Sequence, residues 1–250
     1  MVRKTCTLFF ILCLAAVSFA QSADEIIQKH IEAQGGLDKL QAIKSIKMSG
    51  KMTMEGPGGM AMEGQIIRQQ KRPHFVRMDI RFQGQAMVQA YDGENAWHII
   101  PFMGDPTPQP MPEDQAKQLI HDSDLDGPFV DYKAKGHKIE FVGKEDVEGT
   151  ETYKLKVTLK DGDTFTSFLD SEYYLELKRI VKQKDRRSGN EIEAETFMSD
   201  FKEVNGVMMP HAVKIKGSGP GTINFIVDSM EVNVEMDESV FKMPAEEKKE

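Results

Sequence analysis

The sequence predicts a mainly β (α+β) protein: one strongly curved antiparallel sheet forming an unclosed barrel, whose concave apolar face is covered by an N-terminal helix and a short helical lid. Apolar and polar residues alternate with a period of two over most of the chain, which is typical of strands with one buried face. Asp161-Gly162 and Asn205-Gly206 are dipeptides that favour tight hairpin turns. Only residues 24–43 and 113–135 carry helical patterns that could cover so large a sheet.

The N-terminus has the pattern of a secretory signal peptide, predicted to span residues 1–20. Arg3 and Lys4 precede an apolar run over 8–17, and Ser18-Phe19-Ala20 provides small residues before a cleavage site at Gln21. An uncleaved membrane anchor is the alternative, but the apolar run is too short to span a bilayer. We therefore expect a periplasmic protein, cleaved before Gln21.

Both cysteines, Cys6 and Cys13, lie inside the predicted signal peptide. Leu12 precedes Cys13 where a lipidation signal has a small residue, which argues against a lipoprotein. The mature chain would hold no disulfide, so its core alone must stabilise it. We expect a single domain over 21–244, followed by a disordered charged tail over 245–250.

The charge balance argues against nucleic acid as a partner. Without Arg3 and Lys4 the chain has 30 basic and 40 acidic residues. A chain with this excess of negative charge repels phosphate backbones and anionic membrane surfaces.

The sequence predicts helices in two stretches, 24–43 and 113–136. Over residues 24–43 apolar residues recur every three or four positions, and Gly35-Gly36 predicts either two short helices or a kink. Glu113–His121 reads as a short helix, and a second is expected from Asp126 to Gly136. Prolines are frequent over 101–112 and exclude regular strand there, so residues 101–136 form a lid-like excursion.

About eleven strands are expected, enough for one curved sheet. In the last strand the apolar parity shifts after Val227, which predicts a bulge or bend near Asp228. The expected strands cover residues 48–54, 60–66, 76–82, 86–90, 139–142, 153–159, 165–169, 173–181, 191–198, 207–215 and 222–234.

Short motifs in a fixed order resemble a known family. Lys71-Arg72-Pro73, Phe75, Arg77, Tyr91-Asp92-Gly93 and Trp97 are similar to the core motif of LolA-type lipoprotein carriers. Residues 201–207 with Pro210, and Phe241-Lys242-Met243-Pro244, resemble the broader outer-membrane lipoprotein-sorting family. The resemblance implies an unclosed barrel with a helical lid over an apolar cavity that accepts acyl chains. It also implies that Arg72 is a latch that helps to hold the lid shut.

Methionine is unusually frequent at alternating positions of the first predicted hairpin. Its flexible, polarizable side chain suits a surface that accommodates variable apolar ligands. Ordinary core filling is the alternative, and a copper site built from the pairs Met52-x-Met54 and Met60-x-Met62 is a remote one. The predicted cavity lining consists of Met48, Met52, Met54, Met60, Met62, Ile66, Met78, Ile80 and Trp97.

Motifs of catalysis and metal binding are weak. The six histidines are scattered, and none has the spacing of a zinc site. Asp122-x-Asp124-x-Asp126-Gly127 opens like a calcium loop, but Lys133 occupies the twelfth position, where the loop needs Glu. We therefore expect no enzymatic activity, no cofactor and no metal.

Taken together, these features predict a periplasmic carrier or chaperone. Its ligand would be an acylated lipoprotein or a lipid-like apolar molecule, exchanged with transfer partners at the inner and outer membranes. The alternatives are an envelope protein-interaction or sensor module without lipid transfer and, remotely, a methionine-rich copper-binding protein.

Overall fold

The structure, a computed structural model, describes residues 22–56, 61–101, 105–184, 191–217, 219 and 221–245. The predicted signal peptide, Met60 and most of the predicted charged tail lie outside these residues. Within the described part of the chain, no helix is long and apolar enough to cross a membrane.

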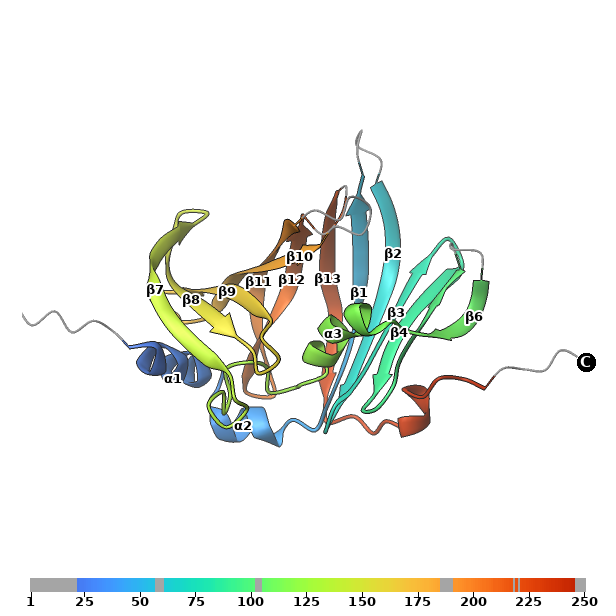
Figure 1. The fold of residues 1–250 in the computed structure, drawn as a ribbon, viewed down its shortest axis with the longest axis horizontal. Helices are drawn as coiled ribbons and strands as arrows, with labels where there is room; N and C mark the ends of the chain where they lie inside the picture. The colour runs from blue at the N-terminus through green and yellow to red at the C-terminus, as the bar shows by residue number, and fades with distance from the viewer. Residues whose placement is uncertain are drawn as a thin grey trace, which may run out of the picture.

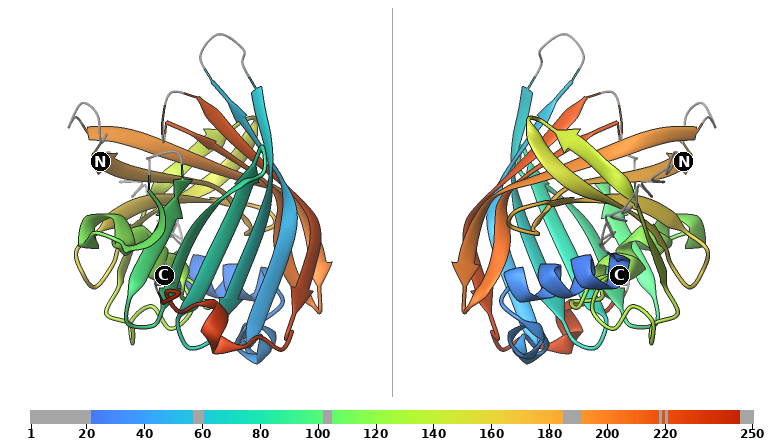
Figure 2. Two further views of the ribbon diagram at one scale, coloured as in Figure 1. Left: turned by 90° about the vertical axis from the view of Figure 1, so that its right-hand side faces the viewer. Right: turned by 90° about the vertical axis from the view of Figure 1, so that its left-hand side faces the viewer.

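Thirteen antiparallel strands form one sheet in the described residues, in the order β6-β5-β4-β3-β2-β1-β13-β12-β11-β10-β9-β8-β7 (Figure 1). The sheet is strongly curved, and its edges β6 and β7 do not pair, so the barrel stays open (Figure 2). The predicted fold class is confirmed. The strands are β1 (Ser45–Glu55), β2 (Ala61–Lys71), β3 (Phe75–Phe82), β4 (Gln85–Asp92), β5 (Ala96–Ile100), β6 (Asp105–Pro110), β7 (Lys138–Val147), β8 (Thr150–Thr158), β9 (Thr164–Asp170), β10 (Glu176–Lys184), β11 (Glu191–Val204), β12 (Val207–Lys216) and β13 (Thr222–Val232).

The N-terminal helical stretch consists of two helices, α1 (Ala23–Ala33) and α2 (Leu37–Ala42). Gly35 and Gly36 separate them with φ angles of 122° and 93°, a region that glycine enters without strain. A side chain at Gly35 would also collide with the backbone of the β11–β12 turn, 2.2 Å from the carbonyl oxygen of Gly206. The predicted interruption is confirmed.

The chain between the two sheet edges crosses the open side of the half-barrel. It forms the predicted helix α3 (Glu113–Asp122) and then the 123–137 segment (Figure 1). The second helix predicted from Asp126 to Gly136 is wrong, because residues 125–136 form turns. Gly127 and Asp131 have φ angles of 62° and 52°, and these left-handed positions interrupt the helical hydrogen-bond ladder.

The proline-rich stretch contains a strand, contrary to prediction. β6 includes three of the prolines, yet it pairs with β5 through contacts such as His98 with Gln109. β6 is an edge strand, and proline is tolerated there because one side of the strand has no partner that needs its N–H groups. The bulge predicted near Asp228 is confirmed, because Ser49 pairs with Ser229 while Gly50 pairs with Val227.

The helices lie on the concave face of the sheet. Ile26 and Ile27 of α1 pack against Leu155 and Val157 of β8 in one apolar cluster. Leu40 of α2 packs with Val207 in a second cluster. The convex face of β3–β5 is covered instead by the C-terminal segment 233–245, which includes the short 3-10 helix η2 (Glu238–Val240).

Candidate ligand-binding site on the concave face

The methionines predicted to line a cavity gather on the concave face of β1–β3. Met52, Ile66 and Ile80 are buried at the centre of a third apolar cluster. Around them lie partly exposed apolar side chains from β1, β3, β4 and β13: Met48, Met54, Met78, Phe82, Met87, Ile223 and Phe225. All ten are strand residues, so no helix of the described chain contributes to this cluster.

Strand pairing explains how the sequence assembles the cluster. β1 and β2 pair with Gly50 opposite Ile66 and Met54 opposite Met62, so the alternating methionines share one face. Met62, at the end of the hairpin, is 47% exposed. Six predicted lining residues therefore come together in the cluster, Met62 lies at its margin, and Met60 lies outside the described residues.

Trp97 is not part of this surface, contrary to prediction. Its ring lies on the convex face, and its indole Nε1 donates to the carbonyl oxygen of Phe241 at 2.7 Å. The prediction placed Trp97 on the same face of the sheet as Tyr91 because both residue numbers are odd. Tyr91 pairs with Ala96, however, so the β4–β5 turn reverses parity and sends the two aromatic residues to opposite faces.

Polar side chains border the methionine cluster, and sequence reasoning missed them. Arg68 pairs with Met48 on one side and Met78 on the other, and His98 lies two strands beyond Met78 in the same row. Arg68 has the same parity as Ile66, which was a signal that its side chain enters the concave face. The C-terminus of α3 reaches Arg68 and the nearby Gln70 of the same strand, whose Nε2 donates to the Asp122 carbonyl oxygen at 2.6 Å.

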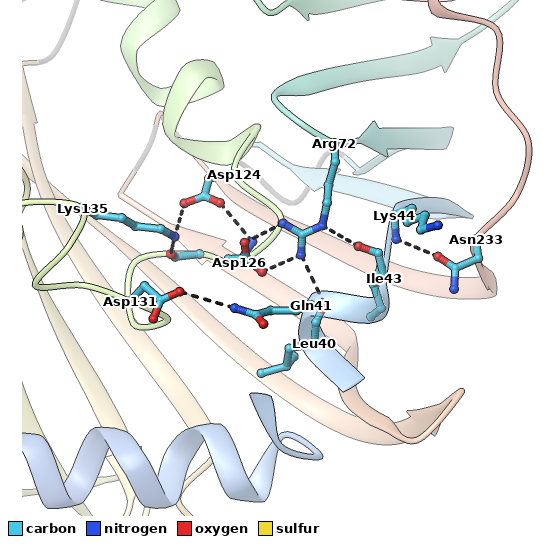
Figure 3. Close-up of polar contacts among 11 residues, drawn as sticks. Leu40, Gln41, Ile43, Lys44, Arg72, Asp124, Asp126, Asp131, Lys135 and Asn233 are labelled. Carbon is cyan, nitrogen blue, oxygen red and sulfur yellow. Dashed lines mark hydrogen bonds and ion pairs between the residues drawn. The ribbon is translucent and has the colours of Figure 1, made fainter. Parts of the chain in front are cut away.

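Arg72 joins α2 to the 123–137 segment at the base of the half-barrel (Figure 3). Its guanidinium forms a bidentate pair with Asp126, with both N–O distances 2.5 Å. It also donates to the carbonyl oxygens of Ile43 at 2.7 Å and Leu40 at 3.3 Å. These two carbonyls belong to the end of α2, so Arg72 contacts the lid segment through the Asp126 carboxylate.

Arg72 and Asp126 each favour the charged form of the other. The hydrogen bonds from Arg72 outweigh partial burial and lower the pKa of Asp126, and Asp126 in turn raises the pKa of Arg72. The remaining acids of the calcium-like stretch also have partners, since Lys135 donates to Asp124 at 2.5 Å and Gln118 donates to Asp122 at 2.9 Å. These contacts account for the run of acidic residues without an ion.

The outer side of α3 contacts the opposite wall of the half-barrel at the β8–β9 turn. His121 Nε2 lies 2.9 Å from Asp161 Oδ2, and Lys117 Nζ lies 3.6 Å from Asp163 Oδ1. His121, Asp161 and Asp163 each offer a ligand atom within 4.8 Å of the others, so a divalent cation could be held there. Lys117 already neutralises part of that negative charge.

Comparison of the sequence with models of protein families gives no match, and comparison with curated proteins gives none. The fold is nevertheless shared with solved structures. A LolA superfamily protein from Nitrosomonas europaea has a TM-score of 0.60 at 12% identity, with 88% of this chain and 97% of that chain covered.

A DUF1329 family protein from Desulfovibrio piger also has a TM-score of 0.60 at 12% identity, covering 87% of this chain and 95% of that chain. An outer membrane lipoprotein-sorting protein domain from Vibrio parahaemolyticus has a TM-score of 0.56 at 12% identity, with the same coverages. The chain therefore has the fold of the LolA superfamily, and none of the three names refers to an enzymatic activity.

Proposed function

We propose that this protein is a periplasmic carrier or chaperone that holds acyl chains against the methionine cluster. The observation that carries this proposal is the cluster itself: ten apolar strand residues on a concave face, seven of them only partly buried. An apolar surface of this kind, to which no helix residue of the described chain contributes, marks an interaction site. Methionine side chains adapt to chains of different shape.

Entry and release of the ligand would be controlled by α3 and the 123–137 segment acting as a lid. In this proposal Arg72 is the latch, because it holds the segment to α2 through Asp126. The signal peptide expected over 1–20 would deliver the chain to the periplasm, and the name of the Vibrio structure refers to the sorting of outer membrane lipoproteins. Transfer partners at the two membranes are part of the proposal.

Lipid analysis of the purified protein is the direct test. Native mass spectrometry of protein purified without detergent should detect a bound acyl lipid, and solvent extraction should release it. A protein that carries no lipid and takes up none from added vesicles would contradict the carrier proposal.

Substitution of the cluster tests the location. Met54→Glu should retain the fold, because Met54 is only partly buried, and should weaken binding of the neutral fluorescent probe N-phenyl-1-naphthylamine by tenfold or more. Met52→Glu should weaken binding too, but Met52 is 3% exposed, so this variant also loses several kcal/mol of stability. Thr53→Glu is the matched control, because it places the same charge on the opposite face of β1.

The second candidate is an envelope protein-interaction module, and one observation on the convex face favours it. Lysine and phenylalanine alternate across β8–β12 as successive cross-strand partners, and Lys178 Nζ lies 5.6 Å and 5.0 Å from the ring centroids of Phe168 and Phe197. The ladder comprises Lys154, Phe168, Lys178, Phe197 and Lys214. Bound lipid favours the carrier, whereas a stable protein complex without lipid favours this module.

A further inference from the structure

Two arginines that contact the lid, Arg72 and Arg68, differ in how many hydrogen bonds they make. Arg72 donates four hydrogen bonds to carbonyl and carboxylate oxygens. Arg68 makes one hydrogen bond, from Nη2 to the Asp122 carbonyl oxygen at 3.3 Å, which is long for a charged donor. Its Nε is buried and has no hydrogen-bond partner among the described residues.

The Asp122 carboxylate does not form a close hydrogen-bonded ion pair with Arg68. Its Oδ2 lies 3.8 Å from Arg68 Nη2, and its Oδ1 accepts a hydrogen bond from Gln118. The cross-strand neighbours of Arg68 are Met48 and Met78, which offer no strong acceptor. A buried donor of a cationic group that lacks an acceptor is costly and rare, so its retention on this surface calls for a functional reason.

The surroundings of Arg68 are those of an amphiphile site. On one side, α3 ends beside Arg68 and Gln70. His98 lies in the cross-strand row of Arg68, and its Nδ1 is also buried without a hydrogen-bond partner among the described residues. On the other side, the methionine cluster extends along β1 from Met48 to Met54. These two methionines are six positions apart in the strand, or roughly 20 Å at about 3.4 Å per residue. That span is comparable to a long acyl chain.

We propose that the ligand is an acyl lipid with an anionic headgroup, whose carboxylate or phosphate binds Arg68 and whose chain lies along β1 and β2 over the methionine cluster. The guanidinium provides Nε and a second N–H in the planar arrangement that matches such oxyanions. This inference rests on the proposed function and narrows it to a ligand class and an orientation.

Matched ligands separate the headgroup from the chain. Dodecanoate and dodecanol, each used below its aggregation limit at pH 8, should compete with N-phenyl-1-naphthylamine for the wild-type protein. Dodecanoate should bind about tenfold more tightly than dodecanol, as expected for one charged hydrogen bond. Acetate alone should not compete at millimolar concentration, because it lacks the chain.

Variants assign this preference to Arg68. Arg68→Gln should bind both ligands with the affinity of dodecanol, whereas Arg68→Lys should keep part of the preference because it keeps the charge. Arg81→Gln is the matched control: Arg81 is exposed on the opposite face of β3, and the variant should behave like wild type.

The outcomes are distinct. Equal affinity of wild type for dodecanoate and dodecanol would overturn the headgroup inference while leaving the carrier proposal intact, as would a preference that survives in Arg68→Gln. Binding of neither ligand, nor of the probe, would remove both proposals. If Arg68 served only to hold α3, Arg68→Gln would weaken both ligands equally, and this result too would contradict the inference.

Discussion

Two parts of the concave face bury apolar side chains in different ways. Over β7–β9, residues of α1 and the 123–137 segment pack directly into the sheet, and Ile26 and Leu155 have no exposed surface. Over β1–β3 the cluster consists only of strand residues, and Met54 and Met78 keep part of their surface exposed. The first part has the organisation of a folding core, and the second is the binding surface of our proposal, although both lie on one sheet.

The residue types differ in the same sense. The core over β7–β9 uses branched and aromatic side chains, which have few rotamers and pack in one way. Half of the cluster over β1–β3 is methionine, which has three rotatable bonds and adapts to its neighbours. Packing and residue type therefore differ together between the folding core and the proposed binding surface.

The largest expected effect compares the two parts directly. Leu155→Ala should lower the free energy of unfolding by about 2–5 kcal/mol, because it opens a cavity among immobile neighbours. Met54→Ala should cost about 1 kcal/mol or less, because its side chain is already partly exposed. Urea unfolding followed by circular dichroism measures both. Similar losses in the two variants would mean that the methionine cluster is ordinary core.

The second effect concerns the boundary between the two parts, where Arg72 holds the 123–137 segment. Arg72→Leu removes the bidentate pair with Asp126, which is partly exposed to solvent and worth roughly 2 kcal/mol. Hydrogen exchange of amides in 123–137 should therefore become about 30-fold faster. Exchange at wild-type rates would show that Arg72 is not a latch.

Two further variants sharpen that measurement. Asp126→Asn should loosen the same segment, because it removes the other partner. Arg77→Leu is the matched control on the convex face, where Arg77 pairs with Asp79 and donates to the carbonyl oxygen of Val240 at 2.7 Å. It should loosen the C-terminal segment 233–245 and leave 123–137 unchanged.

The comparison also shows what could be predicted from the sequence. Alternation and turn dipeptides predicted the open curved sheet, because strand periodicity is local. The face of the methionines was predictable because the β1–β2 hairpin preserves parity. Trp97 was placed wrongly because its face depends on a turn register that residue numbers do not reveal, as Tyr91 pairs with Ala96.

Contacts over long sequence separations were less predictable. Arg72 was identified through the family resemblance, but its partner Asp126 lies 54 residues away and was expected to begin a helix. That helix is absent from the structure because Gly127 and Asp131 adopt left-handed conformations, which the sequence suggested only weakly. Arg68 was missed because a single arginine among methionines resembles the solvated residue of an alternating strand.

A third prediction addresses the packed part through pH. His30 of α1 is buried beside Phe129, and its Nδ1 lies 2.7 Å from the carbonyl oxygen of Tyr174. Burial lowers its pKa below the usual 6.5, against the opposing effects of the Tyr174 carbonyl and Glu176. The folded state therefore binds fewer protons than the unfolded state below pH 6.5, and stability should fall as the pH decreases from about 6.5 toward the lowered pKa.

The change is at most about 1.4 kcal/mol per pH unit, the limit for one proton. Urea titrations at pH 7.5, 6.0 and 5.0 should show this loss in wild type and a smaller loss in His30→Gln, whatever the variant's stability at neutral pH. Binding of the neutral probe at the methionine cluster should change less than stability does. The same pH dependence in both proteins would mean that His30 is not the responsible group.

The smallest expected effect concerns the contact of α3 with the opposite wall. His121 and Asp161 lie at the surface, and Asp161 is 41% exposed, so the pair is worth less than about 1 kcal/mol. Asp161→Asn should therefore leave global stability almost unchanged and increase hydrogen exchange in α3 by no more than about fivefold. The 123–137 segment should remain protected, because the Arg72 pair still holds it. If Asp161→Asn instead loosens 123–137 as strongly as Arg72→Leu does, the lid is held mainly at the β8–β9 turn, and the latch belongs to His121 and Asp161.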